Sequence, residues 1–482
     1  MKLRELLAGV PICAGSADLE MEISGVSYDS RTTRPGDLFV AMTGFATDGH
    51  QYIAKALANG AAAVLCQRRP AEVCAYVQTE DSRRALAVIG GNWFGHPAEE
   101  MTMIAVTGTC GKTTTTYLLK AILEQARGAK VGLIGTNQNM IGSDVIPTER
   151  TTPESFEVQK LFREMADAGC THVVMETSSH ALYLDRVYGV RYDVGIFTNL
   201  TQDHLDFHKT MENYCDAKAI LFRNCVTGVV NADDPWTPRL LKDADCKVMT
   251  YAEQADADLR AENIVLSAGG IAFDAVSGAE RVPIRVNIPG GFMVYNTLDV
   301  LGAALALGIS LEESAAVLAK VPHVKGRVEI VPTPGKDYTI LIDYAHTPDS
   351  MVNVLQTVKE FAKGRTVAVF GCGGDRDRTK RPLMGKAAAD WSDFAVVTTD
   401  NPRTEEPEAI IADILPGFDG SATPYHVVVD RIEAIHWAMD HAETDDVIVL
   451  CGKGHETYQE VNHVKHHMDE REIVADYLSS GR

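Results

Sequence analysis

The sequence predicts an α/β protein that contains several parallel sheets. Short apolar runs, each followed by a polar loop and then by a helical segment, recur through its second and third parts. Examples are "THVVMETSSH" at 171, "DVGIFTNLTQDH" at 193, "RTVAVFGCGGDRDR" at 365, "DFAVVTTDNPR" at 393 and "DVIVLCGKGHE" at 446. This alternation is typical of parallel sheets, whose ligands bind beyond the carboxyl ends of the strands. A chain of 482 residues is long enough for about three domains.

Two stretches predict the domain boundaries. "GNWFGHPAEEM", from Gly91 to Met101, resembles a linker, and proline and glycine cluster again at residues 320–338. The predicted domains are therefore residues 1–98, 99–322 and 323–482.

A phosphate loop opens the second domain. The stretch "AVTGTCGKTTTT" at 105 follows an apolar run that predicts a buried strand, and it precedes a segment with one apolar face that predicts a helix. The usual pattern G-x-x-x-x-G-K-[ST] is altered, because Val106 replaces the first glycine and a glycine stands at Gly108 instead. Backbone N–H groups from Gly108 to Gly111 can still surround phosphate oxygens, with Lys112 on the outer phosphates and Thr113 on magnesium. The loop predicts binding of ATP or GTP.

Composition narrows the class of protein. The net charge of −21 argues against a nucleic-acid or membrane-surface binder, because such proteins present a basic face. No apolar run reaches the roughly 18 residues of a membrane span, and Glu5 interrupts the weak resemblance of the N-terminus to a signal peptide. The ten cysteines form no CxxC pair, which favours free thiols and, with a nucleotide loop, the cytoplasm.

Other polar residues follow the predicted strands of the second domain. Glu176 ends an apolar run, where a nucleotide enzyme places a carboxylate near magnesium, although a glutamate there is more often a cap. His204 and His208 lie four residues apart without the HExxH pattern, so magnesium near a nucleotide fits better than catalytic zinc. Lys218, judged by composition alone, is a solvated helix lysine.

The third domain carries arginine-rich loops. "GCGGDRDRTKRP" at 371 lacks the full dinucleotide pattern but supplies Arg376 and further cations, and "DNPRTEEP" at 400 adds Arg403. "GKGHE" at 452 ends in Glu456, which could hold an ammonium group. Together these loops suit a zwitterionic amino acid, and a set of surface salt bridges explains them equally well.

Over essentially its whole length the chain resembles the Mur ligase family. The matching stretches are "DSRTTRPGDLFVAMTG" at 29, "TGTCGKTT" at 107, "TTP" at 151, "ETSSHAL" at 176 with Arg186, "NLTQDHLDFH" at 199, "AKAILF" at 217, "DYAHTPDS" at 343, "GCGGDRDRTKRPLMG" at 371, "DNPR" at 400 and "GKGHE" at 452. "DNPR" is the pattern of the members that add meso-diaminopimelate. The resemblance implies an N-terminal domain for the UDP-linked substrate, a central ATPase domain and a C-terminal Rossmann-like domain for the amino acid.

The resemblance also implies roles for individual residues. ATP would be bound by Gly108, Thr109, Cys110, Gly111, Lys112, Thr113 and Thr114, with Asp343 and His346 in a segment that closes over the nucleotide. The substrate UDP-N-acetylmuramoyl-L-alanyl-D-glutamate would contact Ser30, Thr151, Thr152, Ser178 and Arg186. Lys218 would be carbamylated by carbon dioxide and, with Thr113, Glu176 and His204, would position magnesium. Diaminopimelate would contact Arg376, Asp400, Asn401, Pro402, Arg403, Gly452 and Glu456.

The implied reaction is an ATP-dependent ligation that a monomer carries out in the cytoplasm during peptidoglycan precursor synthesis. Lys112, Glu176, His204 and Lys218 would be the catalytic residues. Arg403 would pair with the second carboxylate of diaminopimelate, and an arginine left unmatched by lysine would reject that substrate. The alternatives are a lysine-adding or dipeptide-adding ligase of the same family, a folylpolyglutamate synthase, or a nucleotide-binding protein without catalysis.

Overall fold

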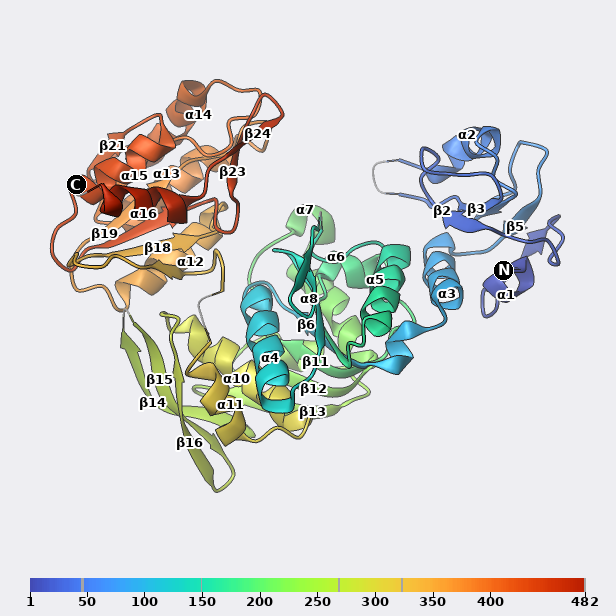
Figure 1. The fold of residues 1–482 in the computed structure, drawn as a ribbon, viewed down its shortest axis with the longest axis horizontal. Helices are drawn as coiled ribbons and strands as arrows, with labels where there is room; N and C mark the ends of the chain where they lie inside the picture. Colours follow the sequence, from blue (N-terminus) through green and yellow to red (C-terminus); the bar gives the residue numbers. More distant parts are fainter. Residues whose placement is uncertain (45–46, 149, 268, 322–323, 481–482) are drawn as a thin grey trace. The chain divides into compact units, whose positions relative to one another are not determined.

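The computed structural model describes residues 1–44, 47–148, 150–267, 269–321 and 324–480, which fall into two compact units. The first comprises Met1–Asp258 and Asp299–Ile309, and the second comprises Leu259–Leu298 and Ser310–Arg482. Each unit is an α/β structure (Figure 1), as the sequence predicts. The predicted boundary between residues 322 and 323 lies outside the described residues.

The first unit begins with a small, mostly parallel sheet of strand order β1-β5-β4-β3-β2. Its strands are β1 (Ala14–Gly15), β2 (Gly25–Ser27), β3 (Asp37–Val40), β4 (Ala63–Cys66) and β5 (Tyr76–Gln78), and its helices are α1 (Leu3–Leu6), η1 (Gly49–Tyr52), α2 (Ile53–Ala58) and α3 (Ser82–Phe94). Leu3 and Leu6 are fully buried in its core. The N-terminal residues are therefore the first element of the fold, as predicted.

The stretch that resembles a linker is largely regular structure. Helix α3 continues to Phe94, Gly95 ends it with a φ of 72°, and Pro97–Glu100 forms the 3-10 helix η2. A glycine in the left-handed conformation is a common helix end. The glycines of this stretch therefore belong to a helix and its cap, and the linker prediction was wrong here.

The larger sheet of the first unit has the order β13-β12-β11-β6-β10-β7-β8-β9, parallel from β13 to β7. The strands are β6 (Thr102–Thr107), β7 (Val131–Ile134), β8 (Asn139–Ile141), β9 (Asp144–Ile146), β10 (His172–Glu176), β11 (Tyr192–Phe197), β12 (Cys225–Asn231) and β13 (Lys247–Ala252). The helices are α4 (Lys112–Arg127), α5 (Ser155–Asp167), α6 (Ser179–Tyr183), α7 (Leu205–His208), α8 (Met211–Ala219), η3 (Ile220–Arg223) and α9 (Thr237–Leu240).

Helices cover both faces of this sheet. Met103 and Ala105 of β6 share a core with Phe162 and Met165 of α5, because alternate residues of a strand point to one face. Helix α4 packs against β6, β7 and β10 from the other side (Figure 1). The carboxyl ends of β6, β10 and β11 therefore meet at one edge, where the candidate site lies.

The second unit contains a three-stranded antiparallel sheet and a mostly parallel one. The first is formed by β14 (Leu259–Ser267), β15 (Gly270–Ser277) and β16 (Glu280–Val286), and helices α10 (Phe292–Ala306) and α11 (Leu311–Leu318) follow along the chain. The second has the order β17-β18-β22-β19-β20-β21, with β17 (Glu329–Val331), β18 (Thr339–Asp343), β19 (Thr366–Phe370), β20 (Phe394–Val397), β21 (Tyr425–Val427) and β22 (Val447–Cys451).

The parallel sheet of the second unit is wound on both sides, as in Rossmann-like folds. One core joins it to α12 (Pro348–Lys359), α13 (Lys380–Trp391), α14 (Pro407–Ile414) and η4 (Leu415–Phe418), and the opposite core joins it to α15 (Arg431–Asp440) and α16 (Glu470–Ser479). The sequence predicts this alternation, and the structure confirms it.

One element of the second unit departs from the predicted pattern. After β22 the chain forms a hairpin of β23 (Tyr458–Val461) and β24 (Val464–His467) before α16 begins. Asn462 and His463, between the strands, have φ angles of 48° and 64°. A two-residue hairpin loop with both residues at positive φ matches the right-handed twist of its strands. Glu460 of β23 contacts Asn401 and Arg403. These two residues, with Asp400 and Glu456, are called the amino-acid cluster below.

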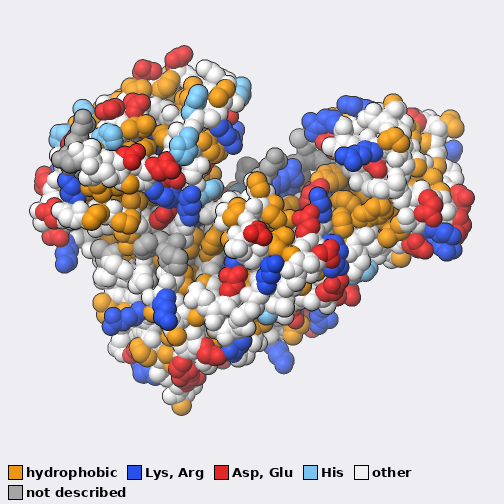
Figure 2. Space-filling model, viewed as in Figure 1, with side chains coloured by type: hydrophobic (Ala, Val, Ile, Leu, Met, Phe, Trp, Pro, Cys, Tyr) orange, Lys and Arg blue, Asp and Glu red, His pale blue; other side chains and the backbone are white. Residues whose placement is uncertain are grey.

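Among the described residues, no helix is long and apolar enough to cross a membrane. On the face shown in Figure 2, basic and acidic side chains are interspersed.

Candidate functional site

The phosphate loop lies between β6 and α4, as predicted. Gly108 has a φ of 152°, and a Cβ atom there would lie 1.9 Å from Oγ1 of Thr198, so only glycine fits. Gly111 has a φ of 90° and directly precedes Lys112, the first residue of α4. The first N–H groups of a helix have no intrahelical partner, so this turn presents donors and a positive dipole end to an anion.

Asn199, which follows β11, fastens the loop from the neighbouring strand. Its backbone oxygen accepts from the N–H of Thr109 at 2.9 Å, and its Oδ1 accepts from the N–H of Cys110 at 3.0 Å. Its Nδ2 also donates to the carbonyl oxygen of Cys110 at 3.2 Å. Two of the amides expected to surround phosphate are therefore bound to Asn199 in this structure, which leaves the amides at the start of α4 for that contact.

Two lysines converge on one carbonyl oxygen of the loop. Nζ of Lys218, on α8, donates to the carbonyl oxygen of Gly108 at 2.7 Å, and Nζ of Lys112 donates to the same oxygen at 2.9 Å. Lys218 is 1% exposed, and its Nζ lies 4.5 Å from the centre of the Tyr214 ring. Burial, followed by repulsion from Lys112, lowers the pKa of Lys218 well below its usual value. A buried lysine of this kind favours the neutral, nucleophilic amine.

Glu176 ends β10 one strand away from the loop and is buried. Its two carboxylate oxygens accept from the backbone N–H of Thr136 at 3.0 Å and from the Thr136 hydroxyl at 2.9 Å. The Thr136 hydroxyl also lies 3.0 Å from that of Thr151. Thr136 therefore links Glu176 to a predicted substrate residue, and no motif in the sequence marks it.

His204 follows β11, which pairs with β6 on the edge opposite to β10, so in the sheet it lies on the other side of the loop from Glu176. It precedes α7 with a φ of 53°, and its ring centre lies 6.1 Å from that of Tyr214 and 4.8 Å from that of His180. The Tyr214 hydroxyl lies 3.3 Å from Oγ1 of Thr109. Tyr214 therefore connects three predicted features, namely the loop, Lys218 and His204. His208 is buried, and its Nε2 lies 2.9 Å from Oγ of Ser179.

The donors near the loop fit magnesium. Within the described ranges, no three His, Cys, Asp or Glu side chains form a metal site by themselves, so the protein alone does not make the closed donor set of structural zinc. The Thr113 hydroxyl at the start of α4 and the Glu176 carboxylate are hard oxygen donors. Magnesium typically takes one or two such groups and completes its shell with water and substrate phosphates.

The predicted UDP-substrate residues of the central sheet form a connected group. The Thr152 hydroxyl donates to the carbonyl oxygen of Glu176 at 2.8 Å and accepts from the N–H of Ser178 at 3.2 Å. Nη1 of Arg186 donates to the carbonyl oxygen of Thr152 at 3.1 Å. Ser30 is buried in the N-terminal sheet region, where its carbonyl oxygen accepts from Asn59 at 2.7 Å.

A second arginine joins this group. Nε of Arg186 and Nη1 of Arg83, on α3, each lie 3.5 Å from the same Oε2 of Glu154, and both nitrogens are buried without a hydrogen bond among the described residues. Burial is the main cause that lowers the pKa of Arg186, and Arg83 adds repulsion. Two guanidinium groups therefore share one carboxylate, which leaves positive charge for an anionic substrate. Arg83 lies outside every motif that the sequence singles out.

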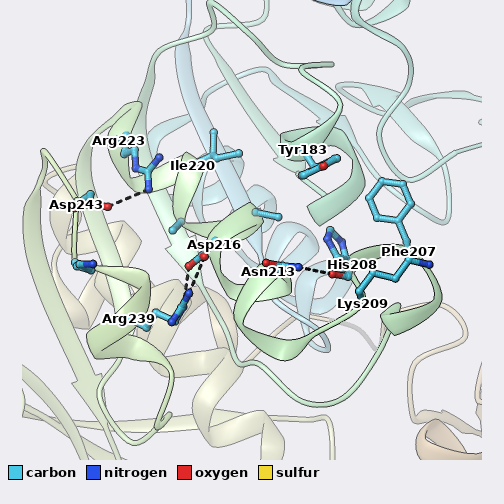
Figure 3. Close-up of a pocket in the computed structure, with 13 residues that line it drawn as sticks. Tyr183, Phe207, His208, Lys209, Asn213, Asp216, Ile220, Arg223, Arg239 and Asp243 are labelled. Carbon is cyan, nitrogen blue, oxygen red and sulfur yellow. Dashed lines mark hydrogen bonds and ion pairs between the residues drawn. The ribbon is translucent and has the colours of Figure 1, made fainter. Parts of the chain in front are cut away.

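A pocket of about 640 Å³ lies on the outer side of α8 (Figure 3). Tyr183 and Phe207 lie at one end, and ion pairs of Arg239 with Asp216 and of Arg223 with Asp243 line the other. Of the residues that the sequence singles out, His208 lines this pocket, whereas the residues implied to bind ATP, the UDP-linked substrate or diaminopimelate do not.

In the second unit, Asp343 is the last residue of β18 and His346 follows it. The carboxylate of Asp343 is buried and accepts from the N–H groups of Val328 and Ala345 at 2.9 and 2.8 Å. Burial raises the pKa of Asp343. His346 is exposed, and its Nδ1 lies 2.7 Å from the carbonyl oxygen of Tyr344.

The arginine cluster after β19 divides into two kinds. Arg381 is fully buried and pairs with Glu405 at 2.7 Å and Asp413 at 2.9 Å, and Arg378 pairs with the same Asp413 at 2.8 Å. The alternative of structural salt bridges therefore holds for these two residues. Arg376 is exposed, and its Nη1 donates to the backbone oxygen of Asp375 at 3.3 Å. Its charge has no carboxylate partner among the described residues.

The tetrad from Asp400 to Arg403 follows β20. Pro402 closes against Gly374, where a Cβ atom would lie 1.9 Å from the Pro402 oxygen. Arg403 has a φ of 52°, and its Nη1 donates to the carbonyl oxygen of Gly374 at 2.8 Å. Its Nε pairs with Glu460 of β23 at 3.1 Å.

Asn401 organises the cluster from the centre. Its Nδ2 donates to Oε2 of Glu456 at 2.9 Å, and its Oδ1 accepts from Nζ of Lys453 at 3.0 Å. Lys453 is fully buried and also donates to Oε2 of Glu456 at 2.9 Å. Gly452, with a φ of 113°, allows close approach to Asp400, because a Cβ atom there would lie 2.6 Å from its Oδ2. Glu456 therefore already has a protein ammonium on one oxygen, and Oε1 has no hydrogen-bond partner in the part of the chain that the structure describes.

Comparison with known proteins agrees with this geometry. Three family models match: the Mur ligase family catalytic domain at residues 22–90, the Mur ligase middle domain at 106–304 and the Mur ligase glutamate ligase domain at 326–454. A protein of Clostridium botulinum named UDP-N-acetylmuramoyl-L-alanyl-D-glutamate--2,6-diaminopimelate ligase is 48% identical over 95% of each chain.

Solved structures share the architecture. One titled as a UDP-N-acetylmuramoyl-L-alanyl-D-glutamate--2,6-diaminopimelate ligase matches with a TM-score of 0.73 and 32% identity, covering 100% of this chain and 99% of that one. The Thermotoga maritima MurF ligase, solved in complex with ADP, matches with a TM-score of 0.61 and 19% identity over 94% and 97% of the two chains, and shows the fold alone. With two core clusters around its Rossmann-like sheet, a phosphate loop on its central sheet and this degree of identity, the chain belongs to the Mur ligase family.

Proposed function

We propose that this chain is an ATP-dependent ligase that adds meso-diaminopimelate to UDP-N-acetylmuramoyl-L-alanyl-D-glutamate in peptidoglycan precursor synthesis. The observation that carries the choice of amino acid is the cluster around Asn401. Within the described residues, it offers an oxygen of Glu456 and the Nη2 edge of Arg403 without a protein partner. A carboxylate oxygen suits an ammonium group and a guanidinium edge suits a carboxylate, so the cluster suits an amino acid that presents both groups.

The reaction proceeds in two balanced steps. A side-chain carboxylate oxygen of the D-glutamate attacks the γ phosphorus of ATP, the bond to ADP breaks, and an acyl phosphate forms. The neutral amine of diaminopimelate then attacks the acyl carbon, inorganic phosphate leaves, and the amine proton passes to solvent. Both steps build negative charge on oxygen atoms, which fixed donors stabilise without reorganisation.

The residues of the loop supply those donors. The amides at the start of α4 and the Lys112 ammonium would hold the phosphates, with Gly108, Thr109, Cys110 and Gly111 forming the turn. Thr113, Glu176 and His204 would hold magnesium, which when bound neutralises phosphate charge and aligns the oxygens.

Lys218 is the residue that we propose to carry a carbamate. Its neutral amine can attack carbon dioxide and release a proton, and the product is a carbamate whose carboxylate is bonded to Nζ. That carboxylate would lie beside Gly108 and add an oxygen donor near the phosphates. Its burial and lowered pKa support the proposal.

The residues that would bind the UDP-linked dipeptide are Ser30, Thr151, Thr152, Ser178 and Arg186. Arg83 would join them, because it shares the Glu154 carboxylate with Arg186. We further propose domains at residues 1–98, 99–322 and 323–482, a monomeric enzyme and a cytoplasmic location. Light scattering of the full chain tests the monomer, because a mass of 52.4 kDa is expected.

Phosphate release with ATP and magnesium tests the reaction. We expect release that requires the UDP-dipeptide and is strongly favoured by meso-diaminopimelate over L-lysine. Equal or greater release with lysine would assign the chain to the lysine-adding ligases. Release that does not depend on the UDP-dipeptide would show that the proposed substrate is wrong.

A further inference from the structure

We propose that Glu460 is a positioning residue that sets how strongly the acceptor site prefers diaminopimelate over lysine. The inference rests on the proposed function, because it concerns the site that would bind the incoming amino acid. It goes further by naming a side chain of the β23–β24 hairpin that acts on the substrate through Arg403.

The first step is the fixed position of the Arg403 guanidinium. Nε donates to Oε2 of Glu460 at 3.1 Å, and Nη1 donates to the carbonyl oxygen of Gly374 at 2.8 Å. A Cβ atom on Gly373 would lie 2.9 Å from Nη1, so the backbone of Gly373 lies against the Nη1 side of the guanidinium. The Nη2 edge has no partner among the described residues and remains for a substrate carboxylate, which a guanidinium binds as a planar fork.

The second step is that Glu460 cannot move independently of the tetrad. Its N–H donates to Oδ1 of Asn401 at 2.9 Å, and its carbonyl oxygen accepts from the N–H of Arg403 at 3.0 Å. The N–H of Asn462, at the hairpin turn, donates to the carbonyl oxygen of Arg403 at 2.8 Å. The hairpin is thus bound to the tetrad through its backbone, and the carboxylate of Glu460 stays beside the guanidinium.

The third step is electrostatic. The side chains of Arg403 and Glu460 are 17% and 20% exposed, so water screens their interaction only partly. Without Glu460, the charge of Arg403 would be paired with the second carboxylate of bound diaminopimelate. With lysine bound it would have no counter-charge, so the binding of lysine would be weaker. Glu460 supplies the missing counter-charge in both states. It therefore makes lysine easier to accept and repels the second carboxylate of diaminopimelate, which reduces the selectivity that Arg403 alone would give.

The test compares Glu460→Gln with Glu460→Asp. Glutamine keeps the size and an oxygen that can accept from Nε, and it removes the charge, whereas aspartate keeps the charge. Glu443→Gln is the matched control, because Glu443 forms an exposed pair with Arg365 at 2.8 Å elsewhere in the same unit. For each full-length variant, kcat/KM for phosphate release is measured with meso-diaminopimelate and with L-lysine, and calorimetric Kd values for both are measured alongside.

We expect Glu460→Gln to raise the ratio of the diaminopimelate to the lysine value about tenfold, because the KM for lysine rises while that for diaminopimelate does not. Glu460→Asp and Glu443→Gln should keep the wild-type ratio within about twofold, an expectation based on retained or remote charge. A ratio that is unchanged or lower in Glu460→Gln would overturn the inference, and so would equal losses with both substrates. If the wild-type chain releases no phosphate in response to diaminopimelate, the proposed function is wrong. If the wild-type chain is active and its selectivity does not change in Glu460→Gln, only the inference about Glu460 is wrong.

Discussion

The phosphate loop of the first unit and the amino-acid cluster of the second lie at the same kind of place and are built differently. Both follow the carboxyl ends of parallel strands. The loop is built from backbone groups, namely Gly108 and Gly111 at positive φ and the first N–H groups of α4. The cluster is built from side chains. Asn401 contacts Glu456 and Arg403 contacts Glu460, and the two residues of each pair are more than fifty positions apart in the sequence.

The difference teaches which kind of site a sequence can reveal and which kind of mutation each site tolerates. A backbone cradle depends on the absence of side chains, so its glycines should be the least replaceable residues. A side-chain network depends on matched charges, so the effect of a mutation there should follow the charge that is left without a partner. Five substitutions, in four tests, separate these cases.

Gly108→Ala should have the largest effect. The added Cβ atom would lie 1.9 Å from Oγ1 of Thr198, so the loop must shift, and a shift of about 1 Å at a reacting phosphate costs on the order of 100-fold in rate. We expect at least that loss in kcat/KM for ATP, measured by phosphate release. Gly128→Ala is the control, because Gly128 ends α4 with a φ of 63° and its added Cβ atom meets nothing within 4 Å. It should cost about 1 kcal/mol of stability and little activity, and comparable activity losses in both variants would contradict the backbone argument.

Lys218→Met tests a side chain that contacts the loop. Methionine fills the same buried volume but cannot carry a carbamate or bind the carbonyl oxygen of Gly108. We expect a loss on the order of 100-fold in kcat, as for removal of one preorganised electrostatic group. With ¹³C-labelled bicarbonate, the wild-type protein should show a carbamate carbon signal that Lys218→Met lacks. A labelled signal that persists in the variant would assign the carbamate elsewhere.

The sequence predicts the loop and the alternation of strands and helices well, because both depend on neighbouring residues. It predicts Glu176 and Arg403 because each follows an apolar run. It does not predict Asn199, Thr136, Lys453 or Glu460, because each meets its partner only when separate strands are brought together. Asn199 and Lys453 follow β11 and β22 directly, so the rule that strand ends carry polar partners could have found them.

Lys218 shows the opposite limit. Composition alone predicts a solvated lysine, and only the family resemblance singles it out. The structure gives the physical reason, since α8 places its Nζ in a buried position on the loop itself. Burial is a property of the packed fold, and a nine-residue helix such as α8 carries too little pattern to reveal it.

Arg376→Met and Arg381→Met separate binding from structure within the cluster. Arg381 is buried between Glu405 and Asp413. Its loss leaves Glu405 without a guanidinium partner and Asp413 with Arg378 alone, and it should cost about 3 kcal/mol of stability. Arg376 is exposed without a carboxylate partner, so its loss should leave the melting temperature unchanged and raise the KM for diaminopimelate about tenfold. Thermal unfolding and initial rates measure the two effects. The same loss of stability in both variants would remove the distinction between them.

Asp299→Asn should have the smallest effect. It tests a side chain that contacts α4, the helix that follows the loop. Asp299 is fully buried in α10, and both of its oxygens lie 3.0 Å from the Thr115 hydroxyl of α4. Burial raises the pKa of Asp299 well above its usual value, so the folded state keeps a proton that the unfolded state releases above about pH 4. The unfolding free energy therefore falls as pH rises from about 4 towards the folded pKa.

Asparagine has no such proton to lose, so the Asp299→Asn variant should gain about 1–2 kcal/mol relative to wild type at pH 8 and little at pH 5. Denaturant unfolding at the two pH values measures the difference, with the exposed Asp419→Asn as the control for lost surface charge. A variant that is less stable at pH 8 than at pH 5, relative to wild type, would mean that Asp299 is charged in the folded protein. The loop would then rest on a buried side-chain charge and would resemble the amino-acid cluster more than its backbone suggests.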